Sequence, residues 1–584
     1  MRKLTWFTGV FFFGALLLTA AATAAQGTDI AEDPLSGPGT ISVETKSNIM
    51  LSFGNRTRII PTSEGDWDFG IDEDFEGTPM AGTLLNGFGT DFFQKHKNES
   101  GWVQDNYIRI EEQVYFNAMP RSRRWSFHGA LEFDRPVDTL TVDDRGGYDS
   151  ETSNFGMERL HGSYMLSENL RLHAGFDIWF MDDPAGLTYG DDAPGFWLNG
   201  KYDSFDFSLA YFKASEQNWG AGADDLPEMS GSKDADRDIY AGYMNYHLAE
   251  GHKLTGMYMY DRIRHVSSGS IEQKLTGLNG SRPDTDVHYL GAVYRGKAGM
   301  LNYFLEGVYR FGEAEEVNAN LAINPKMTRD DYDISSYAAA GDVEMDLSDS
   351  VGMGFKPHLG FIYTSGDDDP DDGDLEGYDG ALSFQRFTRF GGENTIVADT
   401  NIMMGSGVYS FLPALYGNGT PIIAGGLANG NPLGLSRGDN PGLTMAGFGF
   451  SLKPRFDMTF KTNVNSFWWN EDISVASFAA PPLIPADNPN NPFNNPLAVQ
   501  NTRVESDYVG TEWDNEFTLA MSRHSFIKAQ AALLFPGEMI EDATAARTAT
   551  LGAFDPQTGQ MQVVPGEESD EVAYRFGLEF IWQF

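Results

Sequence analysis

Three acidic residues at alternate positions are a candidate chemical site. Glu512, Asp514 and Glu516 are spaced two residues apart, so on a β-strand they share one face. Carboxylates crowded on one face favour raised pKa values or contact with a cation. No nucleophile is evident beside them, the sequence has no His-Glu-x-x-His motif, and its ten histidines are scattered. We therefore expect no enzymatic activity.

Charged and polar residues of both signs recur at alternate positions in many other segments. Their neighbours on either side are mostly apolar, so each segment has one polar and one apolar face if it is a strand. The polar faces could carry ladders of opposite charge across neighbouring strands, either as a filter for a solute or as structural ion pairs with no role in selection. The residues that we predict to share these inner, lumen-lining faces are Arg109, Arg171, His173, Arg310, Lys461, Glu512, Asp514, Glu516, Lys528 and Arg575.

A run of aspartates is the one candidate for binding a metal ion. Hard divalent cations such as calcium prefer carboxylate oxygens, but the spacing does not fit an EF-hand loop because Pro370 falls where a ligand is needed. A solvated acidic loop is the competing interpretation, so we expect no tightly bound cofactor and only weak calcium binding. The candidate ligands are Asp367, Asp369, Asp371, Asp372 and Asp374.

The first residues of the chain have the pattern of an export signal. Arg2 and Lys3 precede an apolar run from residue 4 to residue 18, and small residues follow between Ala20 and Ala25. This pattern predicts a signal peptide over residues 1–25, because the apolar run is short for a membrane helix. We expect a short periplasmic segment over residues 26–42 and one structural domain over residues 43–584.

Alternation with a period of two indicates that this domain is built from strands. In residues 125–134 and 301–311, for example, apolar residues alternate with mostly polar ones, and the 65 glycines and abundant aromatic residues suit many short strands. We predict eighteen strands. Their approximate spans are 43–61, 102–119, 124–135, 155–166, 170–181, 195–202, 205–213, 238–248, 252–262, 286–295, 300–311, 334–346, 354–365, 441–452, 456–469, 508–521, 525–535 and 571–584.

The connections between these strands alternate strictly between short and long. A soluble β-sandwich has no reason to sort its loops in this way, whereas transmembrane barrels have short periplasmic turns, long extracellular loops and an even number of strands. Hydrocarbon offers no water to unpaired backbone groups, so a sheet that crosses a membrane must close on itself. We therefore predict an all-β, transmembrane, antiparallel up-and-down barrel in the outer membrane of a Gram-negative cell.

The last predicted strand adds an independent signal. Its aromatic residues alternate along one face and the chain ends on Phe584, which resembles the C-terminal assembly signal of outer-membrane barrels. The matching residues are Gly577, Phe580, Trp582 and Phe584. The resemblance implies that the barrel-assembly machinery is a partner, along with outer-membrane lipid and lipopolysaccharide.

Two stretches in the second half of the sequence resemble the alginate export family of outer-membrane porins. One comprises residues 509–514 (Val-Gly-Thr-Glu-Trp-Asp) with residues 533–538 (Leu-Leu-Phe-Pro-Gly-Glu), and the other is residues 363–373, where a strand ends in a Ser-Gly-Asp run. The resemblance implies an eighteen-stranded barrel and passive passage of a solute, which could be an acidic polysaccharide. The mixed charges predicted for the lumen do not match the strongly cationic pore of an alginate exporter.

Composition narrows the partners further. The formal net charge of −43 excludes nucleic acid as a partner, because nucleic acid binds basic surfaces. The same charge favours passage of cations over passage of anions. We expect a porin for small hydrophilic solutes or a polysaccharide. An adhesion or complex-forming barrel without a transport role is the alternative.

Within the long connection 366–440, we predict that Met403–Asn431 forms a constriction in the lumen, and a hidden hairpin is the competing interpretation. We expect the proline-rich connection 470–507 to be extended and exposed.

Overall fold

The computed structural model describes most of the strands and part of the connections. The described residues are 41–44, 48–65, 104–137, 156–191, 193–215, 237–263, 284–315, 331–369, 373–378, 380–381, 441–477, 500–548, 550–555, 560–564, 566, 568 and 570–584. The predicted signal peptide and the predicted constriction at Met403–Asn431 lie outside these residues.

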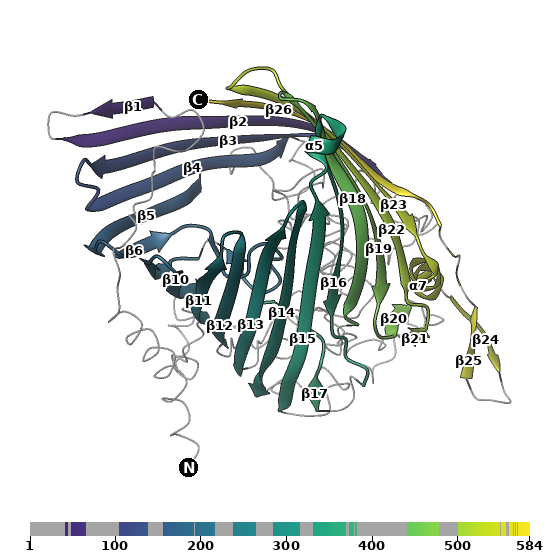
Figure 1. The fold of residues 1–584 in the computed structure, drawn as a ribbon. Coiled ribbons are helices and arrows are strands. Elements are labelled where there is room, and N and C mark those ends of the chain that lie inside the picture. Colours follow the sequence, from purple (N-terminus) through teal and green to yellow (C-terminus); the bar gives the residue numbers. More distant parts are fainter. Residues whose placement is uncertain are drawn as a thin grey trace, which may run out of the picture.

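Eighteen antiparallel strands form a closed barrel (Figure 1). Each strand pairs with its neighbour in the ring, and the last strand pairs with the first one through Arg56 opposite Gln583 and Ile59 opposite Phe580. The predicted number of strands and their approximate positions are therefore confirmed. The ring consists of β2 (Ile49–Gly65), β3 (Gln104–Pro120), β4 (Trp125–Val137), β5 (Gly156–Ser167), β6 (Leu170–Phe176), β9 (Gly195–Lys201), β10 (Phe205–Ser215), β11 (Arg237–Ala249), β12 (His252–Ile263), β13 (Asp284–Ala298), β14 (Leu301–Glu315), β15 (Tyr332–Met345), β16 (Gly354–Thr364), β18 (Leu443–Arg455), β19 (Met458–Trp469), β22 (Tyr508–Ala520), β23 (Ser525–Pro536) and β26 (Ala573–Gln583).

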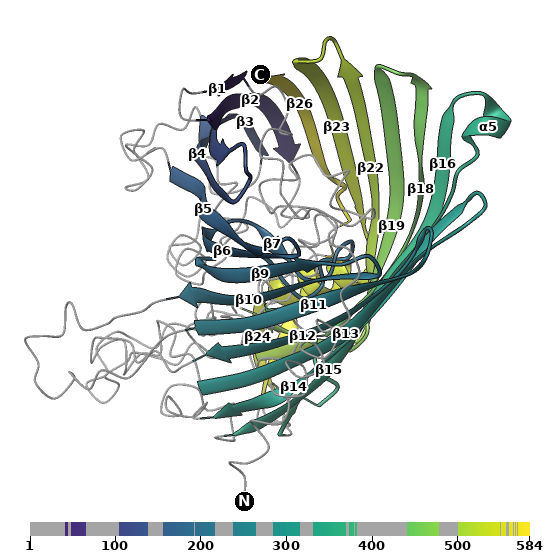
Figure 2. The same cartoon turned by 60° about the vertical axis from the view of Figure 1, so that its left-hand side comes forward.

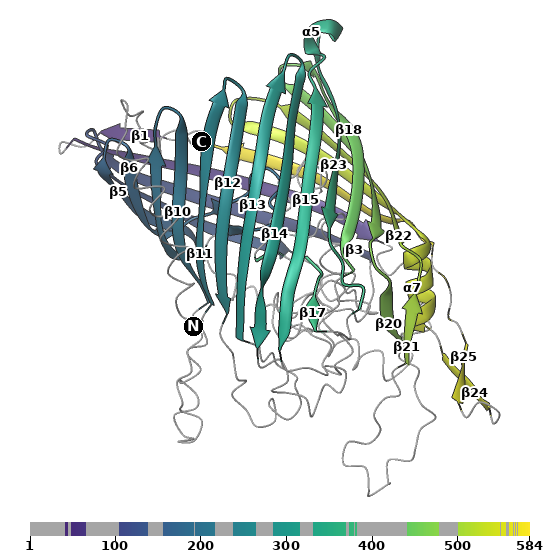
Figure 3. The ribbon, with the colours of Figure 1, turned by 60° about the horizontal axis from the view of Figure 1, so that its bottom comes forward.

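Short elements decorate the two ends of the barrel. The turn helix α5 lies at one end, and β17, β20, β21, α7, β24 and β25 lie at the opposite end (Figure 3), where the long connections join the strands. All the short elements outside the ring, including β7 and β8 in the connection after β6, are β1 (Ile41–Glu44), β7 (Trp179–Phe180), β8 (Gly190–Asp191), α5 (Ser348–Val351), β17 (Asp374–Leu375), β20 (Ile473–Ser477), β21 (Gln500–Val504), α7 (Glu538–Thr548), β24 (Thr550–Asp555) and β25 (Gln560–Val564). The two ends of the connection 470–507 pair with each other as β20 and β21, so the connection is not extended throughout. Its prolines lie outside the described residues.

The outer surface of the barrel is apolar. Leu290, Leu305, Leu359 and Phe448 are each more than half exposed, because alternate side chains of each strand point outward. Exposed apolar patches of this extent are unusual on soluble proteins and are typical of a surface that contacts lipid.

Aromatic rings mark the two edges of this apolar band. Near the long connections, Tyr211, Tyr240, Tyr260, His288 and Phe311 are direct cross-strand neighbours with rings in contact. Near the short turns, further pairs include Tyr294 with Tyr303, Phe355 with Phe450, and Phe580 with Trp582. Such girdles occupy the two membrane–water interfaces. The chain is therefore an outer-membrane barrel that crosses the bilayer with its strands. Among the described residues, no helix is long and apolar enough to span a membrane.

The seam that closes the barrel ends at the C-terminal residue. The N–H of Phe584 donates to the carbonyl of Asn55 at 3.0 Å, and the N–H of Asn55 donates to the carbonyl of Phe584 at 2.8 Å. The rings of Trp582 and Phe584 are both exposed on the outer surface. The C-terminal aromatic pattern therefore faces lipid at the seam, while its role as an assembly signal stays a prediction.

Deleting Phe584 should reduce the yield of folded barrel. Two backbone hydrogen bonds at the seam are lost, which amounts to roughly 1–3 kcal/mol. Heat-modifiable migration on SDS gels measures the folded fraction. Phe584→Ala is the control, because it keeps both hydrogen bonds and removes only the ring. Equal yields for the deletion and the wild type would show that these bonds do not hold the seam.

One predicted strand ends earlier than expected. The alternation predicts a strand over residues 170–181, but β6 stops at Phe176 and the chain then turns into the barrel (Figure 2). Gly175 makes this departure possible: its φ is +134°, and a Cβ added there would lie 2.1 Å from the carbonyl oxygen of Leu160. The predicted strands 170–181 and 195–202 place a long extracellular connection between them. That expectation is wrong for residues 182–191, 193 and 194, because they fold inward.

Replacing Gly175 by valine should lower stability. A side chain at this backbone conformation costs about 1–3 kcal/mol, and the close carbonyl oxygen of Leu160 adds a clash. Urea unfolding in detergent measures the change. Gly256→Ala is the matched control, since a Cβ at Gly256 meets nothing within 4 Å. The strain argument fails if both variants unfold at the same urea concentration.

Candidate pore

The inner surface of the barrel is divided into an apolar side and a polar side. On β10 to β16 the inward side chains are mostly apolar and buried, and they form one continuous cluster. These strands are thus apolar on both faces, so something other than water must cover the inner one. The inward members include Ile239, Met257, Met259, Val287, Tyr289, Val308, Ala338, Ala340 and Ile362.

The connection after β6 covers this apolar wall. We call residues 177–191, 193 and 194 the inward segment. Trp179 and Tyr189 pack on Phe212 of β10, and the indole N–H of Trp179 donates to the hydroxyl of Ser208 at 2.9 Å. Ala185 and Leu187 are fully buried. A hydrophobic contact and a hydrogen bond to the wall therefore hold the inward segment inside the barrel.

Asp182 gives the inward segment its local shape. Its carboxylate accepts the backbone N–H of Thr188 at 2.6 Å and that of Tyr189 at 3.3 Å. Short side-chain-to-backbone bonds of this kind stabilise tight loops. Burial raises the pKa of Asp182, and the hydrogen bonds partly oppose this.

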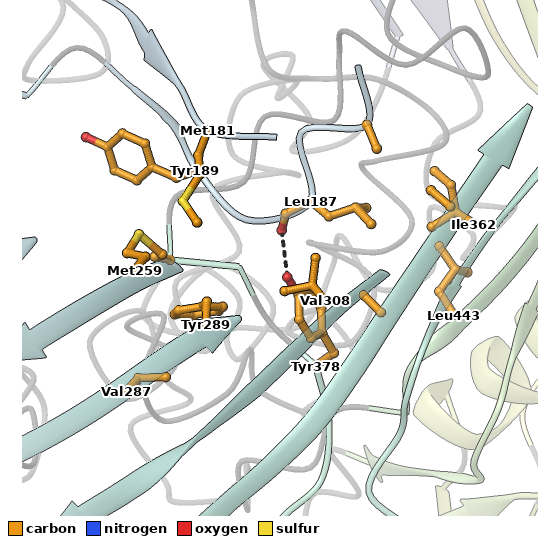
Figure 4. Packing of buried hydrophobic residues seen from close by; sticks show 14 of the residues in the cluster. Met181, Leu187, Tyr189, Met259, Val287, Tyr289, Val308, Ile362, Tyr378 and Leu443 are labelled. Carbon is orange, nitrogen blue, oxygen red and sulfur yellow. Dashed lines mark hydrogen bonds between the residues drawn. The ribbon is translucent and has the colours of Figure 1, made fainter. Parts of the chain in front are cut away.

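A second piece of chain lies against the inward segment. We call residues 373–378, 380 and 381 the strap. The hydroxyl of Tyr378 lies 3.2 Å from the hydroxyl of Thr188 and contacts the carbonyl of Leu187, and its ring meets Tyr289 of β13 edge to face (Figure 4). Ser365 donates to the carbonyl of Glu376 at 2.6 Å. The beginning of the long connection 366–440 therefore enters the lumen.

Two buried arginines tie the strap to the wall. Arg310 of β14 donates to the carbonyl of Gly377 at 2.8 Å, and Arg237 of β11 donates to the carbonyl of Ala381 at 2.7 Å while pairing with Asp261. Arg310 is fully buried. It does lie on the inner face, as the alternation predicts, but it holds a backbone segment there instead of presenting its charge to a solute.

The remaining inner wall is polar. We call the inward side chains of β19, β22, β23, β26 and β2 to β6 the polar arc; these strands are neighbours in the ring across the closing seam. At one end of the arc, Arg171 donates to the hydroxyl of Ser163 at 2.6 Å and to the carbonyl of Arg123 at 2.8 Å. His173 stacks on Trp197 with ring centroids 4.9 Å apart. Both predicted residues are therefore inward.

Ion pairs cross the seam in the middle of the arc. Arg58 of β2 pairs with Glu579 of β26, which also lies 3.5 Å from Lys528 of β23. Glu516 of β22 lies 3.7 Å from Lys461 and 3.9 Å from Lys528. The expected ladder of opposite charges is present here, and it links four neighbouring strands of the wall with β2.

Glu512 and Asp514 differ from Glu516 in having no basic partner. Both are fully buried on the inner face, and Asn465 donates to Asp514 at 3.2 Å. Within the described part of the chain, no lysine, arginine or histidine forms an ion pair with either carboxyl group. The three alternating carboxylates therefore share a face as predicted, but only Glu516 belongs to the ladder.

Some predicted residues are not placed. The side chains of Arg109 and Arg575 lie outside the described set, although β3 and β26 are described, and so do Asp371 and Asp372. Asp367 is buried, whereas Asp369 and Asp374 are exposed. Among the described residues, no three His, Asp or Glu side chains are placed to hold a metal ion together.

Among known proteins, this chain is similar to solved structures of outer-membrane proteins in fold only. OccAB2 of Acinetobacter baumannii has a TM-score of 0.41 and 12% identity, over 91% of this chain and 98% of that one. OprD of Pseudomonas aeruginosa has a TM-score of 0.41 and 9% identity, over 95% of this chain and 97% of that one. OmpT of Vibrio cholerae has a TM-score of 0.33 and 8% identity, over 93% of this chain and 100% of that one. No family model and no curated protein matches the chain.

The alternation pattern could not reveal the inward segment directly, but the sequence held a signal for it. Val287, Tyr289, Val308, Ala338 and Ala340 are apolar at positions that the alternation assigns to the lumen. A strand apolar on both faces must be covered on both. Together with Trp179, Met181, Leu187 and Tyr189 in the nearby connection, this pattern indicates a segment that folds inward.

Proposed function

We propose that the chain is a passive outer-membrane channel for small hydrophilic solutes, and that the polar arc lines the path. The observation that carries this proposal is the division of the lumen. A closed barrel of eighteen strands is wider than its own side chains can fill, the inward segment and the strap cover one side of it, and charged side chains line the other. Selection by width and by wall charge then follows from general principles of pores.

Planar-bilayer recording of the purified protein tests the proposal. We expect discrete single-channel steps in potassium chloride, and swelling of proteoliposomes in small sugars. Protein that inserts, as judged by heat-modifiable migration, yet gives neither conductance nor swelling would refute a channel. That result would favour the adhesion or complex-forming barrel.

We further propose that the channel prefers cations. The chain has a formal net charge of −43, and in the arc the cations Arg58, Lys461 and Lys528 are all paired with carboxylates. Such a wall gives a polyanion little net attraction, so small solutes are favoured over the alginate-like polysaccharide that the resemblance to the alginate export family implies. A reversal potential in a salt gradient that favours chloride would contradict this and support the polyanion.

The outer surface suggests lipid partners as part of the same proposal. Lys213 and Arg262 lie either side of Asp238, at 3.2 and 2.8 Å from its oxygens, directly beyond the row of aromatic residues near the long connections. Basic side chains at the edge of a membrane-spanning surface attract anionic lipid headgroups, and we propose that these two face the phosphates of lipopolysaccharide. Weak calcium binding by the acidic run at Asp367–Asp374 also stays a proposal, and calorimetry at millimolar calcium that shows no heat would end it.

A further inference from the structure

A pair of buried carboxyl groups joins the inward segment to the wall. Asp182 of the inward segment and Glu306 of β14 are each 1% exposed, and their carboxyl groups are within hydrogen-bonding reach of each other. Two ionised carboxylates are acceptors only and repel each other. Contact between them in a buried place therefore requires a shared proton or a bound cation.

The neighbouring contacts indicate which group carries the proton. Asp182 already accepts the N–H groups of Thr188 and Tyr189, so its oxygens act as acceptors. Neither oxygen of Glu306 has a hydrogen bond to any donor in the described part of the chain. The geometry therefore fits a protonated Glu306 that donates to an ionised Asp182.

The other charged groups near the pair are balanced among themselves. Arg295 of β13 is 2.6 Å from Asp183 of the inward segment. Lys253 of β12 interacts with Arg295, Asp183 and Asp206, and Asp206 of β10 is hydrogen-bonded to His247. Tyr378 of the strap is a titratable neighbour of both carboxyl groups and contacts Tyr289, and Tyr243 of β11 lies near Asp183 and Asp206. Arg295 also attracts the charge of Glu306, but its ion pair is with Asp183. A proton shared with Asp182 is then the direct link between Glu306 and the inward segment.

We propose that Glu306 is a positioning residue that holds the inward segment against the wall through a proton shared with Asp182, so that docking of the segment depends on pH. The docked state binds one more proton than the undocked state. Docking is therefore strongest at low pH, where both states are protonated. It weakens by about tenfold for each pH unit over the range in which only the docked state keeps the proton, and it levels off once the docked state has lost the proton as well. The role in gating rests on the proposed channel, whereas the docking itself does not.

A single engineered cysteine reports docking directly. The chain has no cysteine, so Ala185→Cys introduces a unique thiol at a fully buried position. Its labelling by a water-soluble methanethiosulfonate is compared at each pH between the wild-type background and Glu306→Gln, which cancels the effect of pH on the reagent. Glutamine keeps a donor for Asp182 but cannot titrate.

We expect equal, slow labelling of the two backgrounds at pH 5 and at least several-fold faster labelling of the wild-type background at pH 9. Glu306→Ala, which removes the donor, should label fast at both values. The matched control is Asp286→Asn, an outward carboxyl on β13 bonded by Tyr260, which should behave as wild type. Migration on SDS gels confirms that each variant is folded.

Two outcomes would overturn the proposal. One is equal labelling of the wild-type and Glu306→Gln backgrounds at every pH, and the other is labelling that responds to calcium and chelator but not to pH, which would assign a cation to the pair. Conductance distinguishes this proposal from the proposed channel. It should rise with pH in the wild type and stay at its low-pH level in Glu306→Gln, whereas the absence of channels at every pH, with the labelling pattern intact, would refute only the channel.

Discussion

Replacing residues 178–191 by a short Gly-Ser linker should raise the single-channel conductance several-fold. The inward segment covers the apolar wall of β10 to β14, and the strap contacts it through Tyr378. Removal of the inward segment frees the part of the lumen that this segment occupies. It also removes the contact that supports the strap, so the inward segment and the strap both obstruct the lumen less. Single-channel recording in potassium chloride measures the change.

The control for this replacement is removal of the hairpin β24–β25. In the described part of the chain these two strands pair only with each other, and they lie away from the barrel in Figure 1, so we expect unchanged conductance. The linker variant also exposes apolar residues such as Met259 and Val287 to water, and we expect it to unfold at a lower urea concentration than the wild type. Unaltered conductance in a folded linker variant would show that the inward segment does not limit the path.

Replacing Glu579 by glutamine should destabilise the seam by about 3 kcal/mol. The side chains of Arg58 and Glu579 are 8% and 2% exposed, and removal of one charge from a buried pair leaves the other without compensation. Lys528 loses the same partner. Urea unfolding in detergent micelles, followed by tryptophan fluorescence, measures the effect.

A double-mutant cycle separates this charge effect from packing. Arg58→Met combined with Glu579→Gln should recover much of the stability lost in Glu579→Gln, because the unpaired Arg58 is then absent and Lys528 keeps Glu516 as a partner. Lys461→Met is the matched control, since Lys461 is 30% exposed and lies 3.7 Å from its partner, and we expect a loss of less than about 1 kcal/mol. Equal losses for Glu579→Gln and Lys461→Met would contradict a special role for the seam.

The sequence predicts the wall of the barrel far better than its contents. Alternation is a property of each strand alone, so the eighteen strands and the inward faces of Arg171, His173, Lys461, Glu516 and Lys528 follow from it. The role of Arg310 does not follow, because its partner is a backbone carbonyl 67 residues away in the chain.

The alternation does not predict the inward segment, because the segment begins as a continuation of a strand. Leu170 to Phe180 keep the period of two, and only the backbone of Gly175 shows where the chain leaves the wall. Likewise, the pairing of Asp182 with Glu306 depends on how a loop folds back over strands more than a hundred residues later. No local pattern encodes such a contact.

The two sides of the lumen differ in how far apart along the chain their contacts lie. The inward segment touches β10, which begins eleven residues after it ends, whereas Arg58 and Glu579 at the seam are separated by 521 residues. Closing a longer loop costs more conformational entropy, and contacts that are local in sequence form sooner. The covered side can therefore assemble while the ribbon is still open, and the polar arc takes its final form only when the two ends of the chain meet. Any solute path through this barrel comes into existence last.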